Sequence, residues 1–232
     1  LLVIPFSTAL MTASNKQAVN SQTATLQQAQ TLREALAEAF GHKSYVLLVI
    51  GFFTCGFQLA FVTAHLPSYL VDRGLSVEVG GYTLALIGLF NIAGSFGAGY
   101  LGNIIPKRYI LSGIYLTRAI SIAAFISIPA SPAATYTFAI ITGLTWLSTV
   151  PPTSSLVAIM FGTRWFAMLY GFVFFSHQVG SFLGVYLGGL AFEAFGSYQI
   201  VWWLSVAFGV ISALINLPIV EKPVARAAAG TA

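Results

Sequence analysis

The chain has 232 residues, of which 57% are hydrophobic and only 7% are charged. About a quarter of the residues of a soluble domain are charged, so this composition excludes a soluble protein and predicts an all-α bundle of membrane-spanning helices. The formal net charge of +4 does not indicate a nucleic-acid partner, because the basic residues lie mostly in short loops, where they set membrane topology.

The N-terminal part of the chain is expected to precede the helix bundle. Residues 1–10 are apolar but too short to cross a bilayer, and we interpret them as the end of a preceding transmembrane helix. Residues 11–43 are predicted to form a cytoplasmic linker, because the first half of this segment is rich in Ser, Thr, Asn, Gln and Ala and cannot bury enough apolar surface to fold.

The second half of the linker has the pattern of an amphipathic helix at the membrane surface. Thr25-x-x-Gln28 and Thr31-x-x-Glu34 both have the spacing of a capping box. Five apolar residues of this stretch fall close to one face of a helix with about 3.6 residues per turn: Leu26, Ala29, Leu32, Leu36 and Phe40. A solvated linker helix with no further role is the alternative.

The remainder, residues 44–221, is predicted to be a transmembrane domain of six helices, followed by a cytoplasmic tail at 222–232. The six apolar segments are 44–70, 80–102, 109–128, 133–159, 165–190 and 198–219. Basic residues gather on one side of the predicted membrane: Lys16, Arg33, Lys43, Lys107, Arg108, Arg164, Lys222 and Arg226. The other side holds only Arg73, so the positive-inside rule predicts a cytoplasmic linker and a cytoplasmic C-terminus in a multi-pass protein of the cell membrane.

The fifth segment combines a polar cluster with a stripe of small residues. Ser176, His177 and Gln178 lie near its midpoint, where a polar group without a partner costs several kcal/mol, so they should face protein or water. Gly180, Gly184 and Gly188 then recur every fourth residue and predict close packing against a neighbouring helix, whereas Gly143 stands alone. A solute site of a membrane transporter needs such a helix.

The fourth segment contains Pro151 and Pro152 among Ser and Thr residues. A proline pair removes backbone donors, and the carbonyl groups that it frees are expected to be satisfied by the Ser and Thr hydroxyls or by water. We interpret this pair as a flexing point of a cytoplasmic gate, with an inert kink as the alternative.

The loop after the second segment carries a family motif. Gly99-x-x-x-Asn103-x-x-Pro106-Lys107-Arg108 resembles the loop motif G-x-x-x-D-[RK]-x-G-[RK]-[RK] of the major facilitator superfamily, with departures at Asn103, Ile104 and Pro106. Six helices after a cytoplasmic linker resemble the C-terminal half of such a transporter. The segments TAHLPSYLVDRGLS and GFVFFSHQVGSFLGVYLGG are similar to the bacterial branch related to oxalate/formate antiporters and monocarboxylate porters.

This resemblance implies partners, a location and a gate. The partners are a small solute, the lipid bilayer and an N-terminal six-helix half of the same transporter, and the location is the bacterial inner membrane. The first, second, fourth and fifth segments would line the cavity or its gates, and the third and sixth would form outer scaffold. Gly99, Asn103, Lys107 and Arg108 then join the proline pair as candidate gating residues.

The candidate solute contacts are polar or aromatic residues at mid-bilayer depth. They are His177, Gln178, Asn91, Arg118 and Trp146. By this resemblance, the second and fifth segments correspond to helices 8 and 11 of the family. Relatives that carry small carboxylates have a basic residue in each of these two helices. This chain has Asn91 and His177 there, so the pair of positive charges that would hold a carboxylate is absent. His177 could present a cation to an anion, carry a coupled proton, or simply bond to a neighbouring helix.

Structural roles are the alternatives for the other polar residues of the spans. Arg118 has no carboxylate in any span to pair with and needs a carbonyl cluster, water or an anionic solute; its place on a scaffold helix favours structural hydrogen bonding. Asn91, Asn103 and Gln58 are candidates for hydrogen bonds between helices. His65, which precedes Pro67, is expected to end its helix or pack at a gate.

The leading hypothesis is secondary transport of a small organic anion, a monocarboxylate or dicarboxylate, by symport or antiport. A non-transporting half or structural membrane protein, and a transporter of a neutral or drug-like solute, stay open as alternatives. The sequence contains no nucleotide-binding loop, no metal-ligand cluster and no nucleophile motif, so we predict no cofactor, no metal and no enzymatic activity.

Overall fold

The computed structural model describes residues 30–224, and within this range the chain is helical without strands. The predictions for residues 1–10, for most of the linker, including Thr25-x-x-Gln28, and for the end of the tail lie outside the described residues. Six helical spans are long and apolar enough to cross a membrane, which confirms the predicted all-α bundle. They are α3 (Lys43–Asp72), α4 (Val77–Leu101), α5 (Lys107–Ser127), α6 with α7 (Pro132–Thr145 and Val150–Phe161), α8 (Phe166–Phe195) and α9 (Gln199–Asn216).

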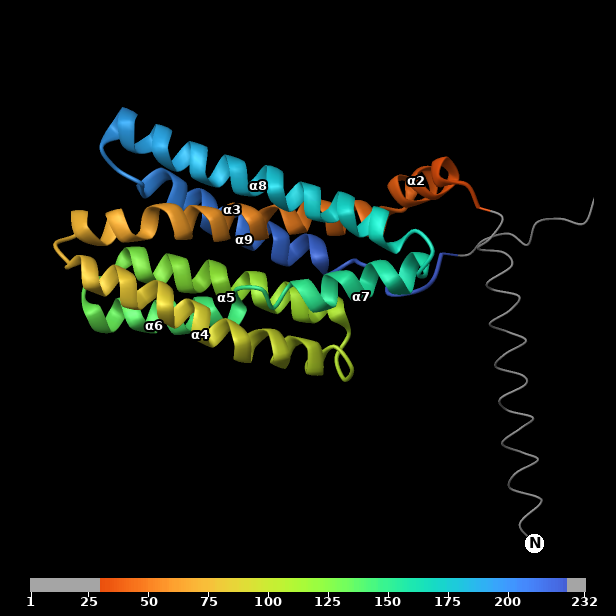
Figure 1. Ribbon diagram of the computed structural model, residues 1–232, viewed down its shortest axis with the longest axis horizontal. Coiled ribbons are helices and arrows are strands. Elements are labelled where there is room, and N and C mark those ends of the chain that lie inside the picture. Colours follow the sequence, from red (N-terminus) through yellow and green to blue (C-terminus); the bar gives the residue numbers. More distant parts are fainter. Residues whose placement is uncertain (1–29, 225–232) are drawn as a thin grey trace, which may run out of the picture.

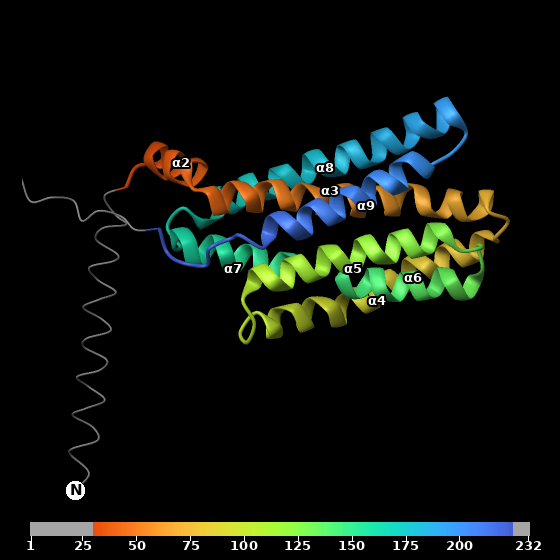
Figure 2. The same cartoon turned by 180° about the vertical axis from the view of Figure 1, so that it is seen from behind.

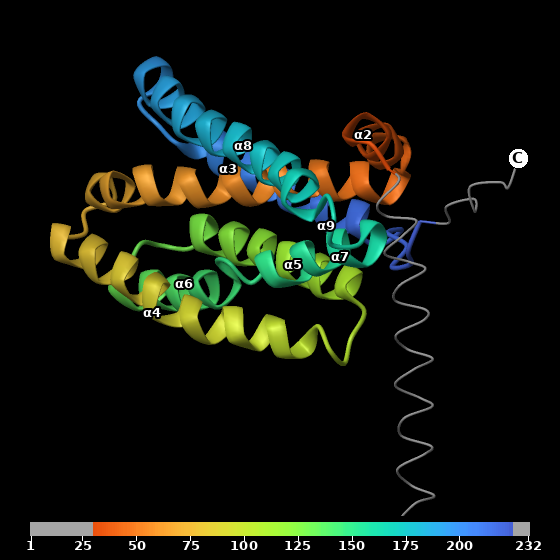
Figure 3. The same ribbon diagram turned by 45° about the vertical axis from the view of Figure 1, so that its right-hand side comes forward.

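The spans form two layers that run lengthwise beside one another. α8, α3 and α4 lie in the nearer layer of Figure 1, and the opposite view brings α9 and α5 to the front (Figure 2). α7 continues beyond the end of α6 toward the end of the bundle where α2 lies (Figure 3). We call this the α2 end and the other the opposite end.

The short helix α2 (Leu32–Gly41) begins at a capping box, as predicted. The Thr31 hydroxyl accepts from the Glu34 amide, and the Glu34 carboxylate accepts from the Thr31 amide at 2.8 Å. The expected apolar face is displaced, however, because Ala35 and Ala39 form the buried seam while Phe40 is 47% exposed. Small residues let α2 approach the bundle closely, and the larger ones flank that seam.

We expect Thr31→Ala to loosen the first turn of α2 by about 1 kcal/mol, because it removes the cap from the Glu34 amide. The hydrogen bond from the Thr31 amide also holds the pKa of Glu34 below its ordinary value of 4.5. Its stabilising effect is therefore present above pH 4.5 and is lost as the pH falls through that lowered pKa. Hydrogen exchange of the α2 amides measures both effects, and equal exchange in Thr31→Ala and the exposed control Arg33→Ala would contradict the capping role.

The closest packing of the fold joins α3 and α8, and it uses the predicted glycine stripe. A Cβ atom on Gly184 would lie 3.1 Å from the carbonyl carbon of Phe57, and one on Gly180 would lie 3.0 Å from the Phe57 amide nitrogen. Gly56 of α3 faces the backbone of His177 in the same way. Backbone therefore lies against backbone along this seam, which confirms the packing prediction.

The expectation that Gly143 stands alone is wrong, and so is one of the two roles expected for His65, that of ending its helix. Gly143 does not stand alone, because a Cβ atom on it would lie 2.7 Å from the Ile87 carbonyl oxygen of α4. His65 does not end its helix, because α3 continues through Pro67 to Asp72, and the His65 ring instead bonds to the Val185 carbonyl of α8 at 2.9 Å.

Candidate functional site

The fourth span is interrupted near its middle, upstream of the proline pair. α6 ends at Thr145 and α7 begins at Val150, so residues 146–149 form a break between two helices. Pro151 and Pro152 lie in the first turn of α7, where a proline needs no hydrogen-bonded amide. The predicted interruption is present, but the prolines start the second helix and do not kink a continuous one.

Arg118 of α5 bonds to two of the carbonyl groups at this break. Its guanidinium donates to the Thr145 carbonyl oxygen through Nε, at 3.0 Å, and through Nη2. Nη2 also donates to the Trp146 carbonyl oxygen at 2.5 Å. Nη1 donates to Gln58 Oε1 at 3.4 Å. The side chain is 3% exposed. The Arg118 guanidinium shares the task that the sequence analysis assigned to Ser and Thr hydroxyls or water, because the Ser148 hydroxyl also donates to the Leu144 carbonyl at 2.6 Å and the Thr145 hydroxyl to the Thr142 carbonyl at 3.1 Å.

Two other helices also bond to the break. Asn91 Oδ1 of α4 accepts from the Leu147 amide at 3.0 Å, which is the interhelical bond expected for Asn91. Cys55 Sγ of α3 lies 3.2 Å from the Thr149 hydroxyl. Side chains from three neighbouring helices therefore fix a segment of four residues, and three predicted solute contacts, Asn91, Arg118 and Trp146, meet there.

His177 and Gln178 lie in the middle third of α8, apart from these three. His177 is half-buried, and its ring is stacked on Phe174 at 5.2 Å and lies 5.2 Å from the ring of Phe52. Its Nδ1 lies 3.1 Å from Gln178 Oε1. Gln178 is exposed on the described bundle. This arrangement offers an imidazole and an amide beside aromatic rings.

Cys55 lies between the two groups of candidate residues. It is fully buried, and besides its contact with Thr149 its thiol interacts with the His177 imidazole. The sequence analysis did not single out Cys55, Phe52 or Phe174. A signal for Phe174 was available, because an aromatic residue three positions before His177 lies on the same helical face.

Five of the six candidate gating residues line one polar concavity of about 90 Å³ at the α2 end. Gly99 and Asn103 come from the end of α4 and the loop after it, Lys107 from the start of α5, and Pro151 with Pro152 from α7. Lys107 Nζ donates to the Gly102 carbonyl at 2.9 Å. Among the described residues, the Asn103 side chain makes no bond between helices, since it donates to the Gly99 carbonyl of its own segment at 3.4 Å.

Arg108, the sixth candidate, is tied to the segment that follows α9. Its amide donates to Glu221 Oε1 at 2.8 Å, and its guanidinium donates to the Ile219 carbonyl at 3.4 Å. A carboxylate at the first turn of α5 complements the positive end of the helix dipole. The loop motif is therefore bonded to the C-terminal segment and shares its concavity with α7.

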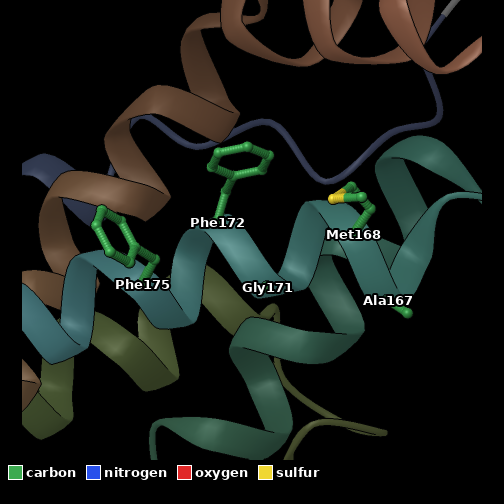
Figure 4. A pocket seen from close by; sticks show the side chains of 5 residues that line it. All are labelled: Ala167, Met168, Gly171, Phe172 and Phe175. Atoms are coloured by element: carbon green, nitrogen blue, oxygen red, sulfur yellow. The ribbon is translucent and has the colours of Figure 1, made fainter.

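A larger concavity, of about 310 Å³, lies on the outer side of α8. Figure 4 shows Met168, Phe172 and Phe175 projecting from this stretch of the helix. Phe172 also meets Phe40 of α2, with ring centroids 5.5 Å apart. The lining side chains carry no charge and no hydrogen-bond donor, so the concavity suits apolar chains better than an anionic solute. No cluster of three or more metal-ligating side chains occurs within residues 30–224.

Two comparisons with known proteins agree with each other. The family model described as Major Facilitator Superfamily matches residues 1–185. The chain is also 32% identical over 186 residues to a protein of Bacillus subtilis (strain 168) named "Uncharacterized MFS-type transporter YcxA". That alignment covers 78% of this chain and 45% of the relative, so the chain spans less than half the length of the relative it matches.

Proposed function

Because this chain belongs to the major facilitator superfamily, we propose that it forms the C-terminal half of a secondary transporter that carries a small organic anion by alternating access. The solute is a monocarboxylate or dicarboxylate moved by symport or antiport. Its contacts on this half are His177 and Gln178 of α8.

The observation that carries the choice of solute is the position of His177. It is an ionisable side chain in the middle third of a membrane-spanning helix, half-buried, with an exposed amide beside it. Ionisable groups at this depth mark solute or proton pathways, because burying them in lipid is costly. A protonated imidazole next to an amide donor matches a carboxylate in charge and in hydrogen bonding.

The uneven burial of the spans supports a second helix bundle as the partner. In the most apolar 18-residue stretch of each helix, only 11% of the α4 residues and 22% of the α8 residues are buried within the described bundle, against 61% of the α3 residues. An N-terminal six-helix half would cover α4 and α8 and complete the wall around His177. The basic residues at the α2 end support a cytoplasmic orientation for that end, in a bacterial inner membrane.

Thermal unfolding of the full-length protein with a panel of solutes tests this proposal. A ligand that binds only the folded state raises its stability by RT ln(1 + [L]/Kd). We expect a small carboxylate to raise Tm and a neutral solute of the same size, such as the corresponding amide, to leave it unchanged. Stabilisation by the amide alone would overturn the anion, and flux absent for every stabilising solute would favour a non-transporting protein.

A further inference from the structure

Arg118 is a buried cation whose hydrogen-bond acceptors in the described range, residues 30–224, are all oxygen atoms of carbonyl groups, and its guanidinium also lies 5.7 Å from the ring centroid of Tyr115. We call the carbonyl oxygens of Thr145 and Trp146, together with Gln58 Oε1, the carbonyl cradle. Burying a charge is strongly unfavourable unless dipoles or counter-charges replace its hydration. The break between α6 and α7 supplies such dipoles, because its carbonyl groups have lost their helical donors.

Discontinuous membrane helices form cation sites in this way. Carbonyl groups of unwound backbone and the C-terminal ends of half-helices attract positive charge. Here the last residue of α6 and the first of the break contribute the oxygens, and the cation present is a guanidinium covalently attached to α5. A planar group with several fixed donors can bond to both backbone oxygens and to the amide at once.

The cradle is anchored to the rest of the bundle by Gln58. While its Oε1 accepts from Arg118, its Nε2 donates to the Ser205 carbonyl of α9 at 2.9 Å. The guanidinium therefore links the break to α3, α5 and α9. On the far side of the break, the first turn of α7 contains the two prolines that line the concavity at the α2 end. The orientation of α7 relative to α6 thus depends on a segment that Arg118 holds.

We propose that Arg118 is the resident cation of the carbonyl cradle and a positioning residue for the gate: it fixes α7 against the concavity at the α2 end without touching the solute. The gating part of this inference rests on the proposed transport function, whereas the cradle does not. Removing the Arg118 side chain should leave a cradle that accepts a free guanidinium ion.

Chemical rescue of Arg118→Ala in the full-length protein tests the cradle. We expect this variant to have a lower Tm than the unmodified protein, and millimolar guanidinium to raise it again. Urea has nearly the same shape but no charge, so it should not. Guanidinium should not raise the Tm of the unmodified protein, whose cradle is filled, nor that of Arg73→Ala, a matched loss of an arginine at the opposite end. Equal effects of urea and guanidinium on Arg118→Ala would overturn the cradle.

Solute binding and transport rate in the same variants test the positioning role. We expect Arg118→Lys, and Arg118→Ala with guanidinium absent, to bind the solute within twofold of the unmodified protein but to transport it at least tenfold more slowly. If Arg118→Ala does not fold, Arg118→Lys supplies this readout, because an ammonium keeps the charge but cannot bond to the whole cradle. Binding lost in parallel with rate would instead place Arg118 at the solute and overturn the inference.

The two proposals fail in different ways. A guanidinium-dependent rise in the Tm of Arg118→Ala, in a protein that moves none of the tested anions, would contradict the proposed function and leave the cradle intact. Anion transport that is normal in both Arg118 variants would contradict the positioning role and leave the proposed function intact.

Discussion

Replacing His177 by alanine is expected to weaken binding of the anionic solute by about 10- to 100-fold, because a hydrogen bond to a charged group contributes about 1.5–3 kcal/mol and each 1.4 kcal/mol is tenfold in affinity. The fold should persist. Alanine is an excellent helix former, and the closest contact of α8 with α3 at this position, that of Gly56 with the backbone of residue 177, is kept when the ring contact with Phe52 is lost. Isothermal titration of the full-length protein with the solute that raises Tm measures the loss.

Two further substitutions separate the charge of His177 from its hydrogen bonding. His177→Lys should restore part of the affinity and flatten its dependence across about pH 5 to 8, where an imidazole loses its proton. His177→Gln should keep hydrogen bonding without the charge. Within residues 30–224, the charged and titratable groups that act electrostatically on His177 are Cys55 and Arg118, and neither is altered in this series.

A second histidine provides the control for this series. His42 lies between α2 and α3 at the α2 end, away from the proposed solute contacts. We expect His42→Ala to bind the solute with the same affinity and pH dependence as the unmodified protein. If His177→Gln and the unmodified protein bind one anion equally at every pH, the cationic role is wrong, and His177 is a neutral partner of its neighbouring helices.

The six spans could be predicted because an apolar run of about 20 residues has few structures available to it in a bilayer. The position of the break could not. A proline pair signals lost donors, but prolines are also favoured in the first turn of a helix, so the pair marks the start of α7 and the chain breaks upstream, at residues 146–149. The sequence pattern therefore indicates that a helix is interrupted, but it does not indicate the residue at which the interruption occurs.

The partners of Arg118 show why the candidate site was only partly predictable. A buried guanidinium without a carboxylate predicts that a carbonyl cluster, water or an anionic solute lies beside it. Two of the three oxygens, however, belong to the backbone of Thr145 and Trp146, and any residue carries such an oxygen. Only the packing of α5 against the break selects them. The same holds for the Leu147 amide that Asn91 accepts from.

Packing seams were predictable in type but not in full extent. The glycine stripe of α8 has a period that identifies it, whereas Gly143 belongs to the close approach of α4 and α6 and has no such period in its own helix. In α2 the larger apolar residues suggested the wrong seam, since Ala35 and Ala39 fit closer to the bundle than Phe40. Small residues in membrane-protein seams therefore need to be weighed as heavily as large apolar ones.

Gly184→Leu is expected to prevent α3 and α8 from packing and to remove most folded protein from the membrane. Even the first added atom would meet the backbone of Phe57, at 3.1 Å from its carbonyl carbon and 3.2 Å from its Cα. Backbone cannot rotate away as a flexible side chain can, so the two helices must separate. Overpacking by a methyl group costs about 1–3 kcal/mol, and we expect Gly184→Ala to fall in this range.

Gly113 is the matched control, because it lies within the spanning helix α5, is exposed, and has no atom within 4 Å of an added Cβ. Gly113→Ala should keep or raise Tm, since glycine is about 1 kcal/mol less favourable than alanine in a helix. Gly113→Leu should be expressed at the level of the unmodified protein. Size-exclusion profiles and thermal unfolding of the four variants measure the difference, and equal stability of Gly184→Leu and Gly113→Leu would show that the α3–α8 seam does not hold this half together.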